Sequence, residues 1–225
     1  MNKRIKIAIN GAGRIGRSFL RLVYTDQQNY GDRIEIVAIN DLGDILNIAY
    51  LLKYDTAYGS AQFPVSVNND KTALLISDKE VRFLSEKDPL HLPWKDLDVD
   101  VVIESTGAFT SYEKAQAHIT TGAKRVVITA PAKQNSPDSA SEVSGETILM
   151  GINEDKLQNC QISSNASCTT NAGAPLIQIL NEKIGIEKAI LNTVHGYTAS
   201  QGVVDGPNKK DWKEGRAAAQ NIIPT

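Results

Sequence analysis

The sequence has little cysteine and no long apolar run, and each absence excludes a class of protein. Two cysteines in 225 residues cannot form a disulfide framework, so we expect a reducing compartment, the cytoplasm. The apolar stretch at residues 5–9 is short and runs into glycine, so neither a signal peptide nor a membrane span is predicted. A formal net charge of -2 provides no positive field, so neither nucleic acid nor a membrane is expected as a partner.

Short apolar segments rich in β-branched residues alternate with helical patterns in the first half of the chain. This alternation is typical of βαβ units, in which helices join buried parallel strands. The sequence therefore predicts an α/β fold with a doubly wound, Rossmann-type parallel sheet. The expected strands are residues 5–10, 34–40, 99–105 and 125–129.

Helical spacing of apolar side chains fills the gaps between these strands. Residues 63–84 differ, because they alternate in short segments broken by polar turns. They predict an antiparallel excursion inserted in the domain. The expected apolar faces of the first two helices are Ile15, Phe19, Leu22 and Val23, and Ile45, Ile48, Ala49 and Leu52.

Three glycines follow the first expected strand with the spacing Gly-x-Gly-x-x-Gly. Gly11 would permit a tight turn, Gly13 would let the backbone approach a pyrophosphate, and Gly16 would allow close packing of helix and strand. The bare pattern also occurs in simple turns. Asp41 ends the second strand, where a carboxylate would bind ribose hydroxyls and repel a 2′-phosphate, so NAD is expected rather than NADP.

Cys168 precedes an expected helix at residues 169–183. A helix amino terminus stabilises a thiolate, so this position would lower the pKa of the thiol and make its sulfur a nucleophile. His195 closes a strand-like segment at residues 189–194 and could act as the base and acid, although a single histidine there is often structural. Cys160 is expected to be a small buried apolar residue. The histidines without a comparable setting, which we expect to be structural, are His91 and His118.

Segments along almost the whole chain resemble phosphorylating glyceraldehyde-3-phosphate dehydrogenases and occur in the same order as in that family. The resemblance implies an NAD-binding Rossmann domain at residues 1–165 and the first part of an α+β catalytic domain with an antiparallel sheet at residues 166–225. The segments are NGAGRIGR (10–17), AIND (38–41), LLKYDTAYG (51–59), ESTGAFT (104–110), GAKRVVITAPAK (122–133), SNASCTTN (164–171), TVHGYT (193–198) and VDGPNKKDW (204–212).

The resemblance also implies a reaction and a role for individual residues. Cys168 would attack the aldehyde of glyceraldehyde-3-phosphate, and His195 would activate the thiol and accept the hydroxyl proton. Inorganic phosphate would then release the thioester as 1,3-bisphosphoglycerate. Ser167 and Thr169 would bind the attacking phosphate, and Thr198 the substrate phosphate. Further cofactor contacts would be Arg14, Ile15, Lys87, Thr106, Gly107 and Thr129.

Two features depart from the family's pattern. Ala172 stands where many members have a second cysteine, and the chain stops at Thr225, where members continue for about another third of their length. We therefore expect a fragment that lacks the substrate-binding arginine and the asparagine that orients the nicotinamide. The family is generally homotetrameric. Two alternatives stay open, an NAD-binding module without turnover and erythrose-4-phosphate dehydrogenase, although VDGPNKKDW favours the triose enzyme.

Overall fold

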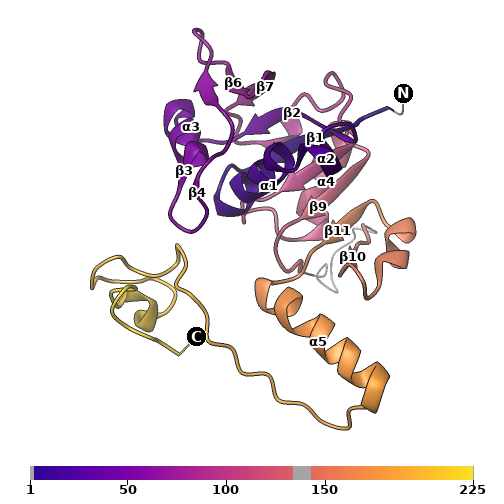
Figure 1. Cartoon of the computed structure of the whole chain (residues 1–225), viewed down its shortest axis with the longest axis vertical. Helices are drawn as coiled ribbons and strands as arrows, with labels where there is room; N and C mark the ends of the chain where they lie inside the picture. Colours follow the sequence, from indigo (N-terminus) through magenta and orange to yellow (C-terminus); the bar gives the residue numbers. More distant parts are fainter. Residues whose placement is uncertain (1–2, 134–142, 225) are drawn as a thin grey trace. The chain divides into compact units, whose positions relative to one another are not determined.

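The computed structural model describes residues 3–133 and 143–224 and is shown in Figure 1. The chain divides into two compact units, Met1–Lys183 and Ile184–Thr225. Each unit is described by itself below.

The described residues of the first unit form a nine-stranded sheet. Neighbouring strands are parallel over most of its width, and only the last two pairs at one edge are antiparallel. A separate two-stranded hairpin consists of β3 (Tyr54–Asp55) and β4 (Gly59–Ser60). The order across the large sheet is β10 (Glu146–Thr147), β11 (Ile162–Ser164), β9 (Arg125–Ile128), β8 (Val101–Glu104), β1 (Ile5–Asn10), β2 (Ile34–Asn40), β7 (Lys79–Leu84), β6 (Ala73–Ile76) and β5 (Val65–Val67).

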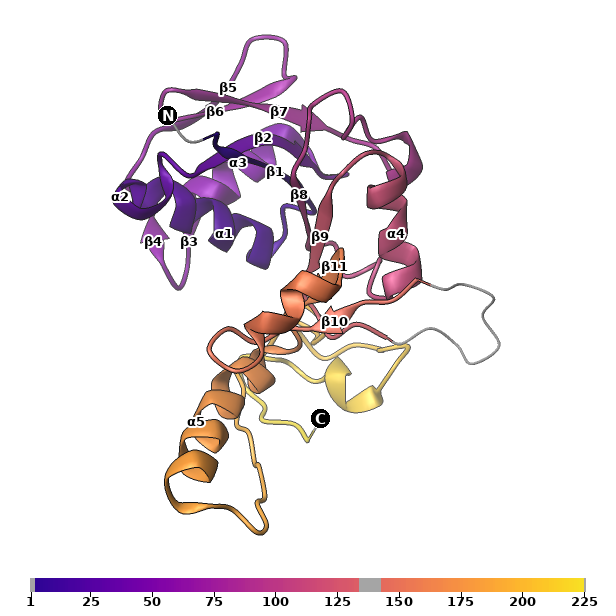
Figure 2. The same cartoon turned by 90° about the vertical axis from the view of Figure 1, so that its right-hand side faces the viewer.

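Helices cover both faces of this sheet, as Figure 2 shows. On one face, α1 (Arg14–Thr25) and α3 (Ile45–Lys53) pack into one apolar core. On the other face, α4 (Tyr112–Thr120) and the short helix η1 (Pro89–His91) border a second core around Trp94. The fold is therefore doubly wound, as predicted. The remaining helices are α2 (Gln27–Tyr30), η2 (Glu154–Asn159), α5 (Cys168–Ile184) and η3 (Trp212–Gly215).

The predicted strands agree closely with those observed. β1 and β2 have the predicted bounds, whereas β8 and β9 are shorter than the predicted residues 99–105 and 125–129. The antiparallel excursion is confirmed in β5, β6 and β7. The structure adds that β7 pairs in parallel with β2, so the excursion extends the main sheet.

The predicted apolar face of α3 is confirmed, because Ile45, Ile48 and Leu52 are buried. The predicted face of α1 is confirmed at Val23, which is buried, and at Phe19, which packs against the same core, but it is wrong at Ile15 and Leu22. Ile15 is 51% exposed and Leu22 is 49% exposed. The glycine loop turns α1 so that Gly16 faces the sheet, and the core positions then follow at helical spacing from that residue. The buried residues of α1 are Gly16, Leu20, Val23 and Tyr24.

The strand-like segment at residues 189–194 is not a strand in the structure, and no described residue of the second unit is in one. Its β-branched side chains are exposed, with Ile190 at 99%. Strand propensity depends on pairing with a neighbouring strand, and the described residues supply none here. The second unit is instead a loop tied to itself through Gly202, whose N–H donates to the Glu214 carbonyl over 2.8 Å and whose carbonyl accepts from the Ala218 N–H over 2.9 Å.

Gly16→Ala should destabilise the first unit. A Cβ at this position would lie 2.2 Å from the Gly11 carbonyl oxygen and 3.2 Å from Ile9. We expect a loss of about 1–3 kcal/mol in the free energy of unfolding, measured by urea denaturation. Gly13→Ala is the matched control, because its Cβ meets only the Ser105 carbonyl oxygen, at 3.9 Å. An equal loss in both variants would contradict this account of Gly16.

Candidate active site

The carboxyl ends of the parallel strands share one edge of the sheet. In the sheet, β2 is the neighbour of β1 on one side. On the other side of β1 lies β8, followed by β9 and then β11. Ligands of doubly wound sheets bind at this edge, where the strand order diverges. The predicted site residues Gly11, Asp41 and Thr129 follow directly on strand ends, and Thr106 follows the end of β8 after one intervening residue.

The glycine loop lies against the turn after β8. Gly11 has φ +97°, and a Cβ there would lie 2.7 Å from both the Ser105 carbonyl carbon and the Thr106 nitrogen. Ser105 Oγ donates to the Gly11 carbonyl over 2.6 Å. Gly13 caps α1 without any side-chain hydrogen bond. The first N–H groups of α1 are therefore arranged to receive an anion such as a pyrophosphate.

A hollow of about 450 Å³ opens at this edge. It is lined by the predicted residues Gly11, Gly13, Asp41, Lys87 and Thr106. Sequence reasoning missed other lining residues. For two of them, Asn10 and Asn40, the signal was a polar side chain at the last position of an apolar strand. The missed residues are Asn10, Asn40, Leu42, Glu86, Ser105, Ala108 and Phe109.

Asp41 joins the end of β2 to the glycine loop. Its Oδ2 accepts from the Ala12 N–H and its Oδ1 from the Gly43 N–H, each over 2.7 Å. These bonds fix the orientation of the carboxylate. Each oxygen can accept a second hydrogen bond, so the group is arranged to receive two neighbouring hydroxyls.

Some predicted cofactor contacts lie outside the lining of the hollow. Arg14 and Ile15 are exposed on the first turn of α1, and Gly107 is exposed with φ +74°. Thr129 follows β9, and its N–H and hydroxyl donate to the Glu104 carbonyl over 2.9 and 3.2 Å. Gly16, the third glycine, is buried under the loop and serves packing.

Cys168 is the first residue of α5, and its side chain is exposed. The preceding turn contains Ala166 with φ +59°, a left-handed conformation that costs a non-glycine residue about 1 kcal/mol or more. The buried Ser164 hydroxyl holds this turn, because it accepts from the Ala166 N–H over 3.1 Å and donates to the Ala130 carbonyl over 2.7 Å. The turn places Cys168 at the carboxyl edge where the glycine loop also lies.

The predicted phosphate ligands Ser167 and Thr169 lie together beside Cys168. Ser167 Oγ is 2.7 Å from Thr169 Oγ1 and 2.8 Å from Thr170 Oγ1, and it accepts from the Thr170 N–H over 3.0 Å. Three hydroxyls thus gather at the amino terminus of a 17-residue helix. Hydroxyl donors and a helix amino terminus are both favourable for a phosphate.

His195 and Thr198 belong to the second unit, so their positions are described only within it. His195 is exposed, and its Nδ1 lies 2.5 Å from the Gly196 carbonyl oxygen. A carbonyl only accepts, so Nδ1 carries the proton and Nε2 of the neutral ring carries the lone pair. Thr198 Oγ1 is 3.1 Å from Ser200 Oγ, and the Thr198 N–H donates to Gln201 Oε1 over 3.3 Å.

Cys160 is buried, as predicted, with 8% of its surface exposed. Burial raises the pKa of its thiol, against the lowering effects of the Glu146 backbone N–H and the Arg125 charge. The two cysteines therefore differ in accessibility and in environment.

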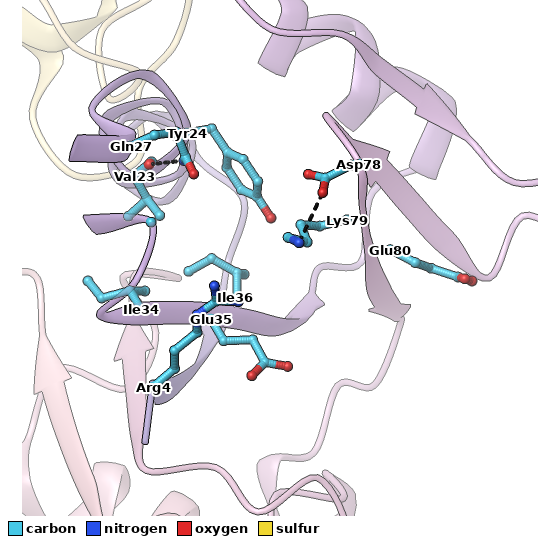
Figure 3. A pocket seen from close by; sticks show the side chains of 11 residues that line it. Arg4, Val23, Tyr24, Gln27, Ile34, Glu35, Ile36, Asp78, Lys79 and Glu80 are labelled. Carbon is cyan, nitrogen blue, oxygen red and sulfur yellow. Dashed lines mark hydrogen bonds and ion pairs between the residues drawn. The ribbon is translucent and has the colours of Figure 1, made fainter. Parts of the chain in front are cut away.

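A second hollow, of about 270 Å³, lies at the amino ends of β1 and β2 and is shown in Figure 3. Tyr24 points into it from α1, opposite the ion pair of Lys79 and Asp78 at 3.0 Å. Burial, with the charges of Asp78 and Glu35, raises the pKa of Tyr24 to about 12. No predicted site residue lines this hollow.

Comparison with known proteins agrees with this arrangement. Residues 5–112 match the family domain described as "Glyceraldehyde 3-phosphate dehydrogenase, NAD binding domain". Residues 167–225 match "Glyceraldehyde 3-phosphate dehydrogenase, C-terminal domain". The chain belongs to the glyceraldehyde-3-phosphate dehydrogenase family.

Relatives from distant organisms share about half of the sequence. The glyceraldehyde-3-phosphate dehydrogenase of Chlamydia muridarum is 50% identical over 224 residues. The cytosolic enzyme of Trypanosoma brucei brucei is 48% identical over 221 residues, and that of Thermotoga maritima is 48% identical over 223. Each alignment covers 98% of this chain and 62% of the relative. The chain therefore spans 62% of the length of these glyceraldehyde-3-phosphate dehydrogenases.

The two family domains divide the candidate site. The residues that line the hollow, from Asn10 to Phe109, fall within the domain described as NAD binding. Cys168 and His195 fall within the domain described as C-terminal. Over residues 3–133 and 143–224, no helix is both apolar and long enough to span a membrane. The same residues contain no cluster of three or more His, Cys, Asp or Glu side chains suited to a metal ion.

An alkylating reagent at neutral pH should label Cys168 well before Cys160. Cys168 is exposed at a helix amino terminus, whereas Cys160 is buried with a raised pKa. Mass-spectrometric mapping of the folded chain over a time course measures both rates, and the urea-unfolded chain serves as the control in which the difference disappears. Equal rates in the folded chain would show that the position of Cys168 confers no reactivity.

Proposed function

We propose that the protein of which this chain is a part oxidises glyceraldehyde-3-phosphate with NAD and inorganic phosphate to 1,3-bisphosphoglycerate. The observation that carries the proposal is the placement of Cys168. It begins α5 after the short turn that follows β11, at the same sheet edge as the uncapped amino terminus of α1 and the Asp41 carboxylate. A nucleophile and a dinucleotide site on one edge suit the oxidation of an aldehyde through a thioester.

The cofactor contacts are part of this proposal. The glycine loop would hold the pyrophosphate, since the α1 amino terminus that follows it is uncapped. Asp41 would accept hydrogen bonds from the adenosine ribose. Lys87 and Thr106 line the same hollow. Bound NAD would supply the hydride acceptor. We also assign cofactor contacts to Arg14, Ile15, Gly107 and Thr129.

The chemistry that we assign to this chain's residues begins at Cys168. Its sulfur adds to the aldehyde carbon and forms a thiohemiacetal. His195 Nε2 accepts the hydroxyl proton as hydride leaves, and a thioester remains on Cys168. Phosphate held by Ser167 and Thr169 then attacks the thioester carbon, and the thiolate of Cys168 leaves. The product keeps the energy of oxidation as an acyl phosphate. Thr198 would bind the phosphate of the substrate.

We propose the boundary between the NAD-binding and catalytic domains at residues 165 and 166. The end of β11 at Ser164 and the second family match from residue 167 support this boundary. The compact first unit extends to Lys183 because it includes α5. A cytoplasmic location and a homotetramer are part of the proposal for the whole protein and rest on the resemblance.

Asp41→Ala should weaken NAD binding and narrow the preference for NAD over NADP. Loss of a charged contact to the ribose hydroxyls should reduce the binding free energy of NAD by on the order of 1–3 kcal/mol. Without the carboxylate charge, the 2′-phosphate of NADP is no longer repelled. Calorimetric titration of both cofactors into both variants measures the ratio of affinities. Asp44→Ala is a matched control, because Asp44 caps the neighbouring helix α3 and does not line the hollow. An unchanged ratio would place the discrimination elsewhere.

The reaction is tested by NADH absorbance with and without inorganic phosphate. A protein extended to the length of the relatives should produce NADH from glyceraldehyde-3-phosphate in a phosphate-dependent manner. Its Cys168→Ser variant should be inactive. The 225-residue chain should bind NAD weakly at most and show no measurable turnover, since positioning groups supply much of the rate.

Parallel assays separate the alternatives. Erythrose-4-phosphate as the better substrate would favour the related dehydrogenase. NAD binding without turnover in the extended protein would favour a binding module. A rate in the 225-residue chain comparable to that of the extended protein would contradict the roles assigned from the family.

A further inference from the structure

The side chain of Glu104 is a buried carboxylate that the proposed reaction does not use. It is 2% exposed at the end of β8. Oε1 accepts from the Thr106 N–H over 2.9 Å and from the Thr106 hydroxyl over 2.5 Å. Oε2 accepts from Asn10 Nδ2 over 2.6 Å and contacts His118 Nε2 at 3.0 Å. A buried charge is tolerated where its lone pairs are satisfied in this way.

Trp94 determines which nitrogen of His118 faces Glu104. The indole Nε1–H can only donate, and it lies 3.0 Å from His118 Nδ1. His118 Nδ1 therefore carries the lone pair, and Nε2–H donates to Glu104. Every neighbour of the carboxylate is then a donor, which corresponds to the ionised form. Both His118 and Trp94 are fully buried.

The hydrogen bonds continue from Glu104 across the ends of neighbouring strands. Asn10 Oδ1 at the end of β1 accepts from Asn40 Nδ2 at the end of β2, over 2.7 Å. Asn40 bonds in turn to the backbone of Glu86, with its Oδ1 accepting from the N–H and its Nδ2 donating to the carbonyl, each over 2.8 Å.

This polar chain, Trp94–His118–Glu104–Asn10–Asn40–Glu86, runs beneath the candidate cofactor hollow. Asn10, Asn40, Glu86 and Thr106, which Glu104 holds, all line the hollow. Trp94 and His118 do not. Trp94 and His118 therefore reach the hollow through Glu104, and His118 also lies 3.5 Å from Asn10 Nδ2 and has its ring 6.2 Å from that of Phe109, both of which line the hollow.

We propose that Glu104 is a positioning residue for the dinucleotide and that His118 and Trp94 hold it in place. Glu104 holds Thr106 in place on one side of the hollow. Through Asn10 and Asn40 it also holds the floor of the hollow and the backbone of Glu86, which follows β7. Cofactor affinity then depends on the indole N–H of a residue that does not line the hollow. This inference rests on the proposed function, since it takes NAD as the ligand.

Two substitutions test the polar chain at different points. Glu104→Gln replaces one acceptor oxygen with an NH2 group, which cannot accept from the donors that face it. Trp94→Phe keeps an aromatic ring, removes the N–H and leaves a smaller side chain in the core. Each should raise the Kd for NAD about ten-fold, as expected for a lost buried hydrogen bond that orients binding groups. Isothermal titration on the protein extended to the length of the relatives gives Kd, and urea unfolding gives the stability of each variant.

Tyr112→Phe is the matched control. Tyr112 is buried in the same core as Trp94, and its hydroxyl lies 3.4 Å from Thr147 Oγ1, away from Glu104. Its loss should leave the Kd for NAD unchanged. If Trp94 only stabilised the core, the folded Trp94→Phe and Tyr112→Phe variants would bind NAD with the same Kd. Should Glu104→Gln fail to fold, the comparison of these two aromatic variants decides the question.

A ligand-free measurement separates failure of this inference from failure of the proposed function. Nitrogen NMR of His118 should show the Nε2–H tautomer, and Trp94→Phe should shift the amide of Thr106 while Tyr112→Phe should not. If the unsubstituted extended protein shows these signals but does not bind NAD, the proposed function is wrong, and so is the choice of NAD as the ligand. If it binds NAD and Trp94→Phe binds with the same Kd, the positioning role is overturned.

Discussion

The candidate site depends on the close approach of two backbones, the glycine loop after β1 and the turn after β8. No side chain fits between them, because a Cβ on Gly11 would meet the peptide of Ser105 and Thr106 at 2.7 Å. That contact fixes where α1 begins, and the packing of Gly16 under the loop then fixes which face of the helix enters the core. The anion-binding terminus and the hydrophobic core are thus set by one steric constraint.

Much of the first unit could be predicted from its sequence, because a buried parallel strand needs a continuous apolar segment. β1 and β2 were predictable to the residue for this reason. The rotation of α1 was not, since the choice of Ile15 and Leu22 as core positions followed hydrophobicity alone. A glycine counts for little in an apolar pattern, yet the close approach at Gly16 determines the buried face.

The candidate site was predictable where a residue type carries its own chemistry, as at Asp41 and Cys168. It was not predictable where the function of a side chain comes from pairing across strands. Asn10, Asn40 and Glu104 are adjacent only because the ends of β1, β2 and β8 are neighbours in the sheet. The segment at residues 189–194 has strand composition without a described partner strand, and composition alone does not provide the pairing that a strand requires.

The left-handed alanine before Cys168 has a consequence for how this turn tolerates change. Selection for stability alone would favour glycine at position 166, where a positive φ costs nothing. Glycine would also let the turn adopt many more conformations, whereas alanine leaves few alternatives once Ser164 holds the segment. The turn therefore combines a small loss of stability with a narrow range of orientations for the cysteine, and natural variation at this position should be confined to small side chains that keep this balance.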